Sequence, residues 1–482
     1  MLALQAGWLT AADKPVPATT GKNSTPGAIS TSGNANSVEA TANDLIIRGD
    51  SFRAKGDYDQ AIAWYEKALK IREQVLGLEH PETADSYNNL GTAWRAKGDY
   101  DQAIAWFEKA RVIFELELGK DHPYTATSYN NLGVAWEAKN DFDQAIAWFE
   151  KALKIKEKVL GLDHPDSATS YNNLGAAWDS KGDFNQAIAW YEKARQVQEK
   201  ALGREHPNTA TTYNNLGAAW KAKGEYGQAI AWFEKALKIN EKAMGLDHPD
   251  TALGYNNLGA AWRAKGDYDK AIAWYEKALK IWEKVLGLEH PATATTYNNL
   301  GSAWRAKGDF DKAIAWFEKA LKIKEKVLGL DHSSTATTYN NLGSAWRAKG
   351  DFDQAIAWHE KALKIREKVL GLEHPETASS YNNLGEAWWA KGDFDQAIAW
   401  HEKALKIWEK VLGLEHPDTA TSYNNLGLAR AAKGDYPKAL DYERKALAIW
   451  EKKLPADHPT IQLARKNIAD IETEQAAAGR GR

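Results

Sequence analysis

A pattern of 42 residues recurs along this chain without insertion or deletion. Nine copies carry the segment Tyr-Asn-Asn-Leu-Gly, with the tyrosines at Tyr87, Tyr129, Tyr171, Tyr213, Tyr255, Tyr297, Tyr339, Tyr381 and Tyr423. A fixed period of this length is typical of repeat architectures, in which each unit buries its apolar face against its neighbours. The frame extends back to a degenerate copy at 45–86, which gives ten copies in all.

Each copy is expected to fold into two helices. In the second copy, Tyr87, Leu90 and Trp94 fall at helical spacing and form one apolar stripe on a first helix. Gly98 closes this helix, because glycine takes the left-handed conformation that commonly ends helices. Asn140, which replaces this glycine in one copy, is the next-best residue for that conformation.

The second helix begins at a capping aspartate, which is Asp99 in the second copy. Gly91 and Ala103 lack bulk and should let the two helix backbones approach closely. In most copies the second helix ends with Leu-Gly-Leu, where Gly161 is expected to take the left-handed cap and Leu162 to fold back onto the last turn. The predicted fold class is therefore all-α.

The repeats divide the chain into three parts. Residues 13–42 are rich in Thr, Ser, Gly, Asn, Ala and Pro without a hydrophobic period, so we expect a flexible leader over residues 1–44. Residues 45–464 are expected to form a right-handed α-solenoid of about ten antiparallel helix pairs. Residues 465–482 should supply a capping helix with a polar outer face and a disordered tail.

Composition excludes several classes of function. The formal charge of -3 gives no global attraction to nucleic acid or to an anionic membrane. The chain has no cysteine, and no apolar run reaches the roughly 18 residues that cross a bilayer. The opening MLALQAGWLTAADK lacks the basic segment of a secretion signal. We therefore expect a cytoplasmic location, with a signal peptide as the alternative.

The repeated residues resemble the tetratricopeptide signature. The matching positions in the second copy are Tyr87, Leu90, Gly91, Trp94, Gly98, Tyr100, Ala103, Phe107 and Ala110. The 42-residue period and the stretch ALKIREKVLGLEHPETA at 362–378 are more specific, and resemble the repeats of kinesin light chains. The resemblance covers 45–464 and implies a superhelix that binds peptides in a concave groove. The leader has no heptads like those of kinesin light chains, so the resemblance implies a repeat array and no motor subunit.

Two asparagines follow the tyrosine in nine copies. The first of each pair lies at Asn88, Asn130, Asn172, Asn214, Asn256, Asn298, Asn340, Asn382 and Asn424. An amide both donates and accepts, so a ladder of amides could hold an extended peptide backbone, and the resemblance implies the same use. The alternative is hydrogen bonding between helices within the array, above all for the second asparagine of each pair, such as Asn89.

One position on the same helix stripe changes its charge from copy to copy. It runs Arg53, Arg95, Glu137, Asp179, Lys221, Arg263, Arg305, Arg347, Trp389 and Ala431. Four successive members are basic: Lys221, Arg263, Arg305 and Arg347. We expect about 20 Å between neighbouring members. On a groove wall these cations could select acidic side chains or steer a partner. The alternative is a solvated face whose charges vary freely.

Tryptophan and histidine also follow the repeat. Seventeen of the 22 tryptophans occupy two repeat positions and are expected in helix packing. The remaining tryptophans within the repeats, Trp282, Trp389, Trp408 and Trp450, are candidates for an exposed anchor, and Trp389 shares the groove stripe. Ten of the 12 histidines lie one per repeat in loops and cannot converge on a metal. His359 and His401 replace an aromatic residue and are expected to be partly buried neutral rings, with a pH-sensitive site as the alternative.

No phosphate-binding loop, nucleophile elbow or metal motif occurs, so the sequence predicts no catalytic residue, no cofactor and no metal site. The leading hypothesis is a non-enzymatic adaptor that binds an extended, acidic segment of a protein or peptide. The first alternative is a structural, self-assembling spacer with no dedicated ligand. The second is nucleic-acid binding through the basic position, which would show steep salt dependence.

Overall fold

The computed structural model describes residues 32–480, with side chains described from 39 to 478. All regular elements in this part of the chain are α-helices, and no strand occurs among the described residues, so the all-α prediction is confirmed. The helices are α1 (Ser32–Ala54), α2 (Tyr58–Val75), α3 (Pro81–Lys97), α4 (Tyr100–Glu117), α5 (Pro123–Ala138), α6 (Phe142–Leu160), α7 (Pro165–Lys181), α8 (Phe184–Ala201), α9 (Pro207–Ala222), α10 (Tyr226–Met244), α11 (Pro249–Lys265), α12 (Tyr268–Val285), α13 (Pro291–Lys307), α14 (Phe310–Val327), α15 (Ser333–Lys349), α16 (Phe352–Leu370), α17 (Pro375–Lys391), α18 (Phe394–Val411), α19 (Pro417–Ala432), α20 (Tyr436–Lys453) and α21 (Pro459–Arg480).

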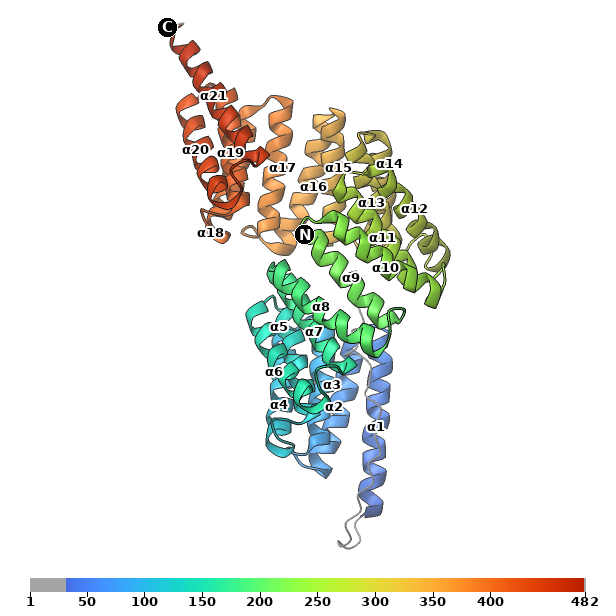
Figure 1. Ribbon diagram of the computed structural model, residues 1–482. Helices are drawn as coiled ribbons and strands as arrows, with labels where there is room; N and C mark the ends of the chain where they lie inside the picture. Colours follow the sequence, from blue (N-terminus) through green and yellow to red (C-terminus); the bar gives the residue numbers. More distant parts are fainter. Residues whose placement is uncertain (1–31, 481–482) are drawn as a thin grey trace. The chain divides into compact units, whose positions relative to one another are not determined.

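The helices belong to two compact units that divide between Ala243 and Met244. In unit 2, from Met244 onwards, each helix from α11 to α21 packs against the next (Figure 1). In unit 1, up to Ala243, α1 to α9 follow one another in the same way, and Tyr213 of α9 shares a core cluster with Ile239 of α10. Each unit is therefore a stack of helix pairs.

The two helices of a repeat cross where a ring lies on a glycine. In the pair α13 and α14, the buried Phe317 ring lies so close to Gly301 that an added Cβ would be 2.7 Å from it. Leu300 and Ala313 are fully buried beside this crossing. The same close approach recurs in each repeat from Gly49 to Gly385, which confirms the role predicted for the small residues.

The first helices end as the sequence predicts. Gly98 has a φ of 92°, and the substitute Asn140 has a φ of 65°, so both take the left-handed conformation. Asp99 accepts a hydrogen bond from the backbone N–H of Gln102 at 3.1 Å and thereby caps α4. The same aspartate cap recurs in α2, α6, α8, α12, α14, α16 and α18.

The loop histidines are a second set of helix caps, which the sequence analysis did not identify. His80 Nδ1 accepts the backbone N–H of Glu82 at 3.3 Å, at the beginning of α3. The equivalent bond forms at all nine later loop histidines. Each bond satisfies an N–H group that has no partner within the helix, so these histidines are structural.

Two tryptophan positions lie in the packing between helices, as predicted. Trp106 stacks on Tyr87 with the ring centroids 5.6 Å apart, and Lys109 Nζ lies 3.9 Å from the Trp106 centroid. Trp94 packs against the same core cluster. These tryptophans therefore stabilise the array.

The expectation of an exposed anchor is wrong for Trp282, Trp408 and Trp450, which are 8%, 5% and 7% exposed. They share a position on the second helix that faces the first helix of the following repeat. In another repeat this position holds Arg366, whose Nη1 donates to the Glu376 carbonyl at 3.0 Å and to Ser380 Oγ at 2.9 Å. The position is therefore buried between neighbouring helices: Trp408 shares a core cluster with Tyr381 of its own repeat, and Arg366 bonds to the next repeat, which the stripe pattern of a single helix does not show.

The end of the second helix also differs from its prediction. Gly161 has the expected positive φ of 92°, but its ψ of 163° turns the chain away from α6. Leu162 consequently remains 61% exposed, so the expected packing of this side chain on the last turn is wrong.

The repeat array begins earlier than predicted. Helix α1 begins at Ser32, so residues 32–44 belong to it and the leader boundary at 44 is wrong for them; residues 1–31 lie outside the described part of the chain. Arg72 of α2 holds the first half of α1 in place, because its Nε donates to Glu39 at 3.0 Å and its Nη2 donates to Asn43 at 2.8 Å. The final helix α21 likewise begins at Pro459 instead of 465.

Polar residues replace the crossing aromatic in the last three repeats. His359 and His401 are 1% and 2% exposed, and burial lowers their pKa values to about 3 and about 4, so both rings are neutral as predicted. Glu443 is fully buried beside Gly427, and burial raises its pKa to about 8. This carboxyl group is therefore protonated over most of the neutral range.

The Gly301→Ala substitution should destabilise the array by roughly 1–3 kcal/mol, because the added Cβ would overlap the Phe317 ring. Urea unfolding followed by circular dichroism measures the change. The control is Gly227→Ala, since a Cβ at this helical position meets nothing within 4 Å, and it should be neutral or stabilising. Equal loss of stability in both variants would contradict the crossing as the critical contact.

Glu443 should make the last repeat less stable as the pH rises. Its folded-state pKa is raised from 4.5 to about 8, so the unfolded chain loses the proton first and stability falls between these pH values. Glu443→Gln should abolish this loss and protect α20 and α21 by at least about 1 kcal/mol at pH 9. Hydrogen exchange of these helices at pH 5 and pH 9 measures it, with the exposed Glu474→Gln as the control. The same pH dependence in wild type and Glu443→Gln would exclude this explanation.

Candidate functional site

The position with variable charge lies in the last turn of each first helix. We call the residues at this position, one per repeat, the variable column. Arg263, Arg305, Arg347 and Trp389 occupy α11, α13, α15 and α17 of unit 2, whereas Lys221 occupies α9 of unit 1. A cation in the last turn of a helix interacts favourably with the helix dipole, which accounts for basic residues here in part. The structure thus brings three of the four predicted cations together within one unit.

Arg305 is the central cation of unit 2. Its guanidinium is half-buried, and among the described residues it forms no ion pair or hydrogen bond. Burial lowers its pKa, and the like charges of Arg263 and Arg347 lower it further. Arg305 therefore carries a positive charge that the protein itself does not neutralise.

The two flanking arginines have partners. Burial raises the pKa of the Tyr275 hydroxyl to about 12, and the positive charge of the nearby Arg263 opposes the shift. Arg347 Nη2 lies 3.0 Å from Glu386 Oε2, and Glu386 also accepts a hydrogen bond from Asn382 Nδ2 at 3.1 Å. The sequence analysis missed both Tyr275 and Glu386, although Glu386 replaces the small or neutral residue that most other repeats carry.

The expected spacing of about 20 Å between these cations is wrong. Cα atoms of α13 and α15 approach within 8 Å, and the pair of Arg347 with Glu386 joins α15 directly to α17. The spacing of 20 Å assumes that a second helix separates the first helices of adjacent repeats, but these first helices touch one another. The charges of neighbouring members are therefore close enough to affect one another, as the lowered pKa of Arg305 shows.

The corresponding column in unit 1 carries charges of both signs, with the acidic pair Glu137 and Asp179 between basic residues. Burial raises the pKa of Glu137 to about 7; Asp179 raises it further, while the hydroxyl of Ser180 at 3.3 Å and the charge of Arg95 oppose the shift. Burial also raises the pKa of Asp179, and Lys221 opposes this change. The charge of Lys221 is thus balanced in part by Asp179.

The asparagines form a ladder between repeats. The second asparagine of one repeat donates its Nδ2 to Oδ1 of the first asparagine in the preceding repeat. In unit 2 the bond from Asn341 to Asn298 is 2.9 Å long, and that from Asn383 to Asn340 is 2.6 Å long. Asn340 Oδ1 also contacts His359 Nδ1 at 3.1 Å. Hydrogen bonding within the array therefore accounts for the second asparagines of these pairs.

The first asparagines keep part of their hydrogen-bonding capacity. Asn298 and Asn340 are half-buried, and within the described residues their Nδ2 groups donate to no protein atom. Asn256 and Asn382 are 6% and 7% exposed and are less accessible. The free amide groups of Asn298 and Asn340 are therefore the ones that could donate to a ligand carbonyl.

Trp389 is the exposed aromatic of the column. Its side chain is 45% exposed, and it follows Trp388, which packs against the core. An exposed indole next to a basic surface offers both apolar contact area and an N–H donor to a partner. The structure thus confirms the exposure expected of Trp389.

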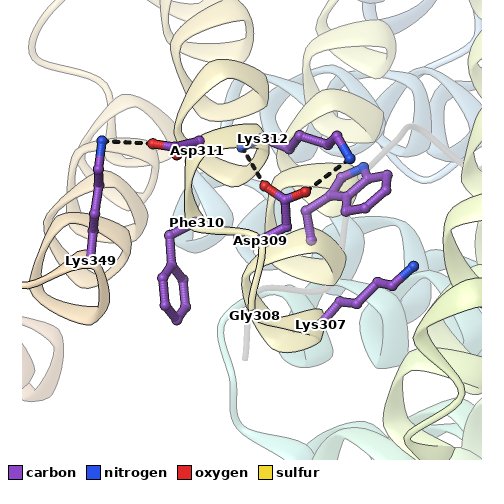
Figure 2. Close-up of a pocket in the computed structure, with 8 residues that line it drawn as sticks. Lys307, Gly308, Asp309, Phe310, Asp311, Lys312 and Lys349 are labelled. Carbon is purple, nitrogen blue, oxygen red and sulfur yellow. Dashed lines mark hydrogen bonds and ion pairs between the residues drawn. The ribbon is translucent and has the colours of Figure 1, made fainter.

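A cavity of about 540 Å³ lies beside the end of α13 (Figure 2). Its charged groups pair with one another: Lys349 Nζ lies 2.6 Å from Asp311, and Lys312 Nζ lies 2.9 Å from Asp309. Similar cavities occur one repeat earlier and in unit 1. A cavity that recurs with its charges already paired belongs to the repeat geometry and offers no free group to a ligand.

No group of three or more His, Cys, Asp or Glu residues that could hold a metal ion occurs within residues 32–480. No helix of that region is long and apolar enough to span a bilayer.

Comparison with known proteins identifies the repeats. The tetratricopeptide repeat family model matches residues 41–110, 95–158, 137–194, 166–242, 250–326, 303–368, 334–388 and 384–452. A search of curated protein sequences gave no match.

Similar solved structures include three of different origin. BtubC (BKLC) from P. vanneervenii is 27% identical, with 48% of this chain and 92% of that chain covered and a TM-score of 0.41. The putative kinesin light chain repeats of Podospora anserina are 27% identical, with 43% and 99% covered and a TM-score of 0.39. The apo quorum sensor NprR from B. thuringiensis is 15% identical, with 77% and 99% covered and a TM-score of 0.51, so it shares the fold. Because the family model spans most of the chain, this protein belongs to the tetratricopeptide repeat family.

Proposed function

We propose that the chain is a non-enzymatic scaffold that binds an extended, acidic segment of another protein along the first helices of unit 2. Tetratricopeptide repeats are typically protein-interaction scaffolds, and this membership supports the general part of the proposal. The acidic character of the ligand rests on the arginine surface, which we define as Arg263, Arg305, Arg347 and Trp389.

The unpaired charge of Arg305 carries the proposal. A half-buried cation between two like charges is unfavourable, and its lowered pKa reports that cost. A ligand carboxylate would remove the repulsion and could accept two parallel hydrogen bonds from the planar guanidinium. Arg263 and Arg347 lie on the neighbouring repeats, so an acidic segment that runs along the stack would meet Arg263 and Arg305 in succession and then Arg347, which Glu386 already pairs.

The asparagines would fix the ligand backbone. Asn298 lies on α13 with Arg305, and Asn340 lies on α15 with Arg347. Their Nδ2 groups are available to peptide carbonyls, whereas their Oδ1 atoms are held by the following repeat. Amide groups held in this way would lose little freedom on binding, which favours affinity.

Arg305→Gln should weaken the binding of an acidic probe about tenfold, because one charge-assisted hydrogen bond contributes roughly 1.5–3 kcal/mol. The measurement is fluorescence anisotropy of a labelled octaglutamate peptide at several salt concentrations. The matched control is Lys322→Gln, an exposed residue of α14 outside the arginine surface, which should change the affinity less than twofold.

Equal weakening by both substitutions would mean that only net charge attracts the probe, and would contradict the proposal. Tighter binding of labelled oligothymidylate than of octaglutamate would favour nucleic acid instead. Once the probe has established the surface, affinity capture with wild type and Arg305→Gln, followed by mass spectrometry, identifies the natural partner as the protein that only the wild type retains.

A further inference from the structure

Unit 2 exposes an apolar residue in each loop between repeats. The leucines Leu246, Leu288, Leu330, Leu372 and Leu414 are 61–62% exposed, and the valines Val285, Val327, Val369 and Val411 are 44–48% exposed. We call these nine residues the leucine ridge. Each valine precedes its leucine by three residues, at the end of the second helix, so the pairs form small apolar patches that recur with the repeat.

Ion pairs join these loops into one edge of the stack. A lysine at the end of each second helix pairs with the acidic residue that follows the leucine of the preceding loop. The pairs in unit 2 are Lys284 with Asp247, Lys326 with Glu289, Lys368 with Asp331, Lys410 with Glu373 and Lys452 with Glu415. Successive leucines therefore lie along the same edge, each beside one positive and one negative side chain.

The fold does not require leucine at these positions. Two repeats of unit 1 carry Lys120 and Arg204 at the leucine position, and Glu117 and Ala201 at the valine position, within helix pairs of the same form. A charged residue is thus compatible with the loop. Five successive leucines that remain more than half exposed in unit 2 consequently need an explanation other than packing within the chain.

We propose that the leucine ridge is a docking surface for a second copy of this chain. The apolar patches recur once per repeat, and a second array presents patches with the same spacing, so every patch can be covered in one complex. Two ridges related by a two-fold axis would also place lysines of one copy near acidic residues of the other, because each edge carries both signs.

The exposed area agrees with a dimer of this kind. The nine side chains expose on the order of 800 Å², which is the area that each partner contributes to a standard specific interface. The side chains of the flanking pairs, such as Lys368 and Asp331, are 65% and 59% exposed, so they remain accessible as a polar rim around the apolar contacts. This inference does not depend on the arginine surface, so the two proposals are tested separately.

Sedimentation equilibrium of the full chain over 1–100 µM tests the proposal. Wild type should approach twice its monomer mass of 53.5 kDa at the upper concentrations. Leu330→Lys combined with Leu372→Lys should raise the dissociation constant at least about tenfold, because it introduces like charges at the centre of the interface. Both positions accept lysine in principle, since Lys120 occupies the same place in unit 1.

The matched control is Gln354→Lys combined with Gln396→Lys. It adds the same charge at exposed positions where Lys270 and Lys312 stand in other repeats, and it should dimerise as wild type does. Circular dichroism verifies that each variant is folded, and Leu330→Gln with Leu372→Gln replaces the lysine variant if that one unfolds. A wild type that stays monomeric at 100 µM, or a ridge variant that dimerises like the control, overturns the proposal.

Discussion

The contact between a ring and a glycine at each helix crossing is the constraint on which the rest of the structure depends. Phe317 can reach Gly301 only because the glycine has no side chain, and this approach sets the distance between the helices of the repeat. The same contact recurs through both units, so each repeat presents an equivalent surface to the next. His359, His401 and Glu443 keep the position but bury polar atoms there.

The division between shared and variable residues explains where function can reside. Shared residues such as Leu300 and Tyr297 are buried and hold the stack together. The variable column lies on the same first helices without entering the core, so its charge can change between repeats while the fold is kept. In unit 1 the acidic and basic members of the column partly compensate one another's charge. In unit 2 Arg305 has the cations Arg263 and Arg347 on either side.

Much of this structure could be predicted from the sequence, because helix ends and core stripes depend on local residues. Gly98 and Asp99 set the junction between helices through their own backbone and side chain. Burial of Trp282 and pairing of Arg347 with Glu386 depend instead on contacts between helices, and the pattern of a single helix does not contain that information. The position of Arg305 on a first helix was predictable, but its lack of a partner was not, since this depends on the surroundings in three dimensions.

The central claim is that the variable column decides ligand charge while the shared residues decide the fold. Conversion of the acidic members in unit 1 tests it directly, through Glu137→Arg combined with Asp179→Arg, at positions where Arg95 stands in a neighbouring repeat. Isothermal titration of octaglutamate into this variant should show two binding sites per chain where wild type shows one, with unchanged helicity by circular dichroism. A single site, or a loss of helicity, would contradict the claim.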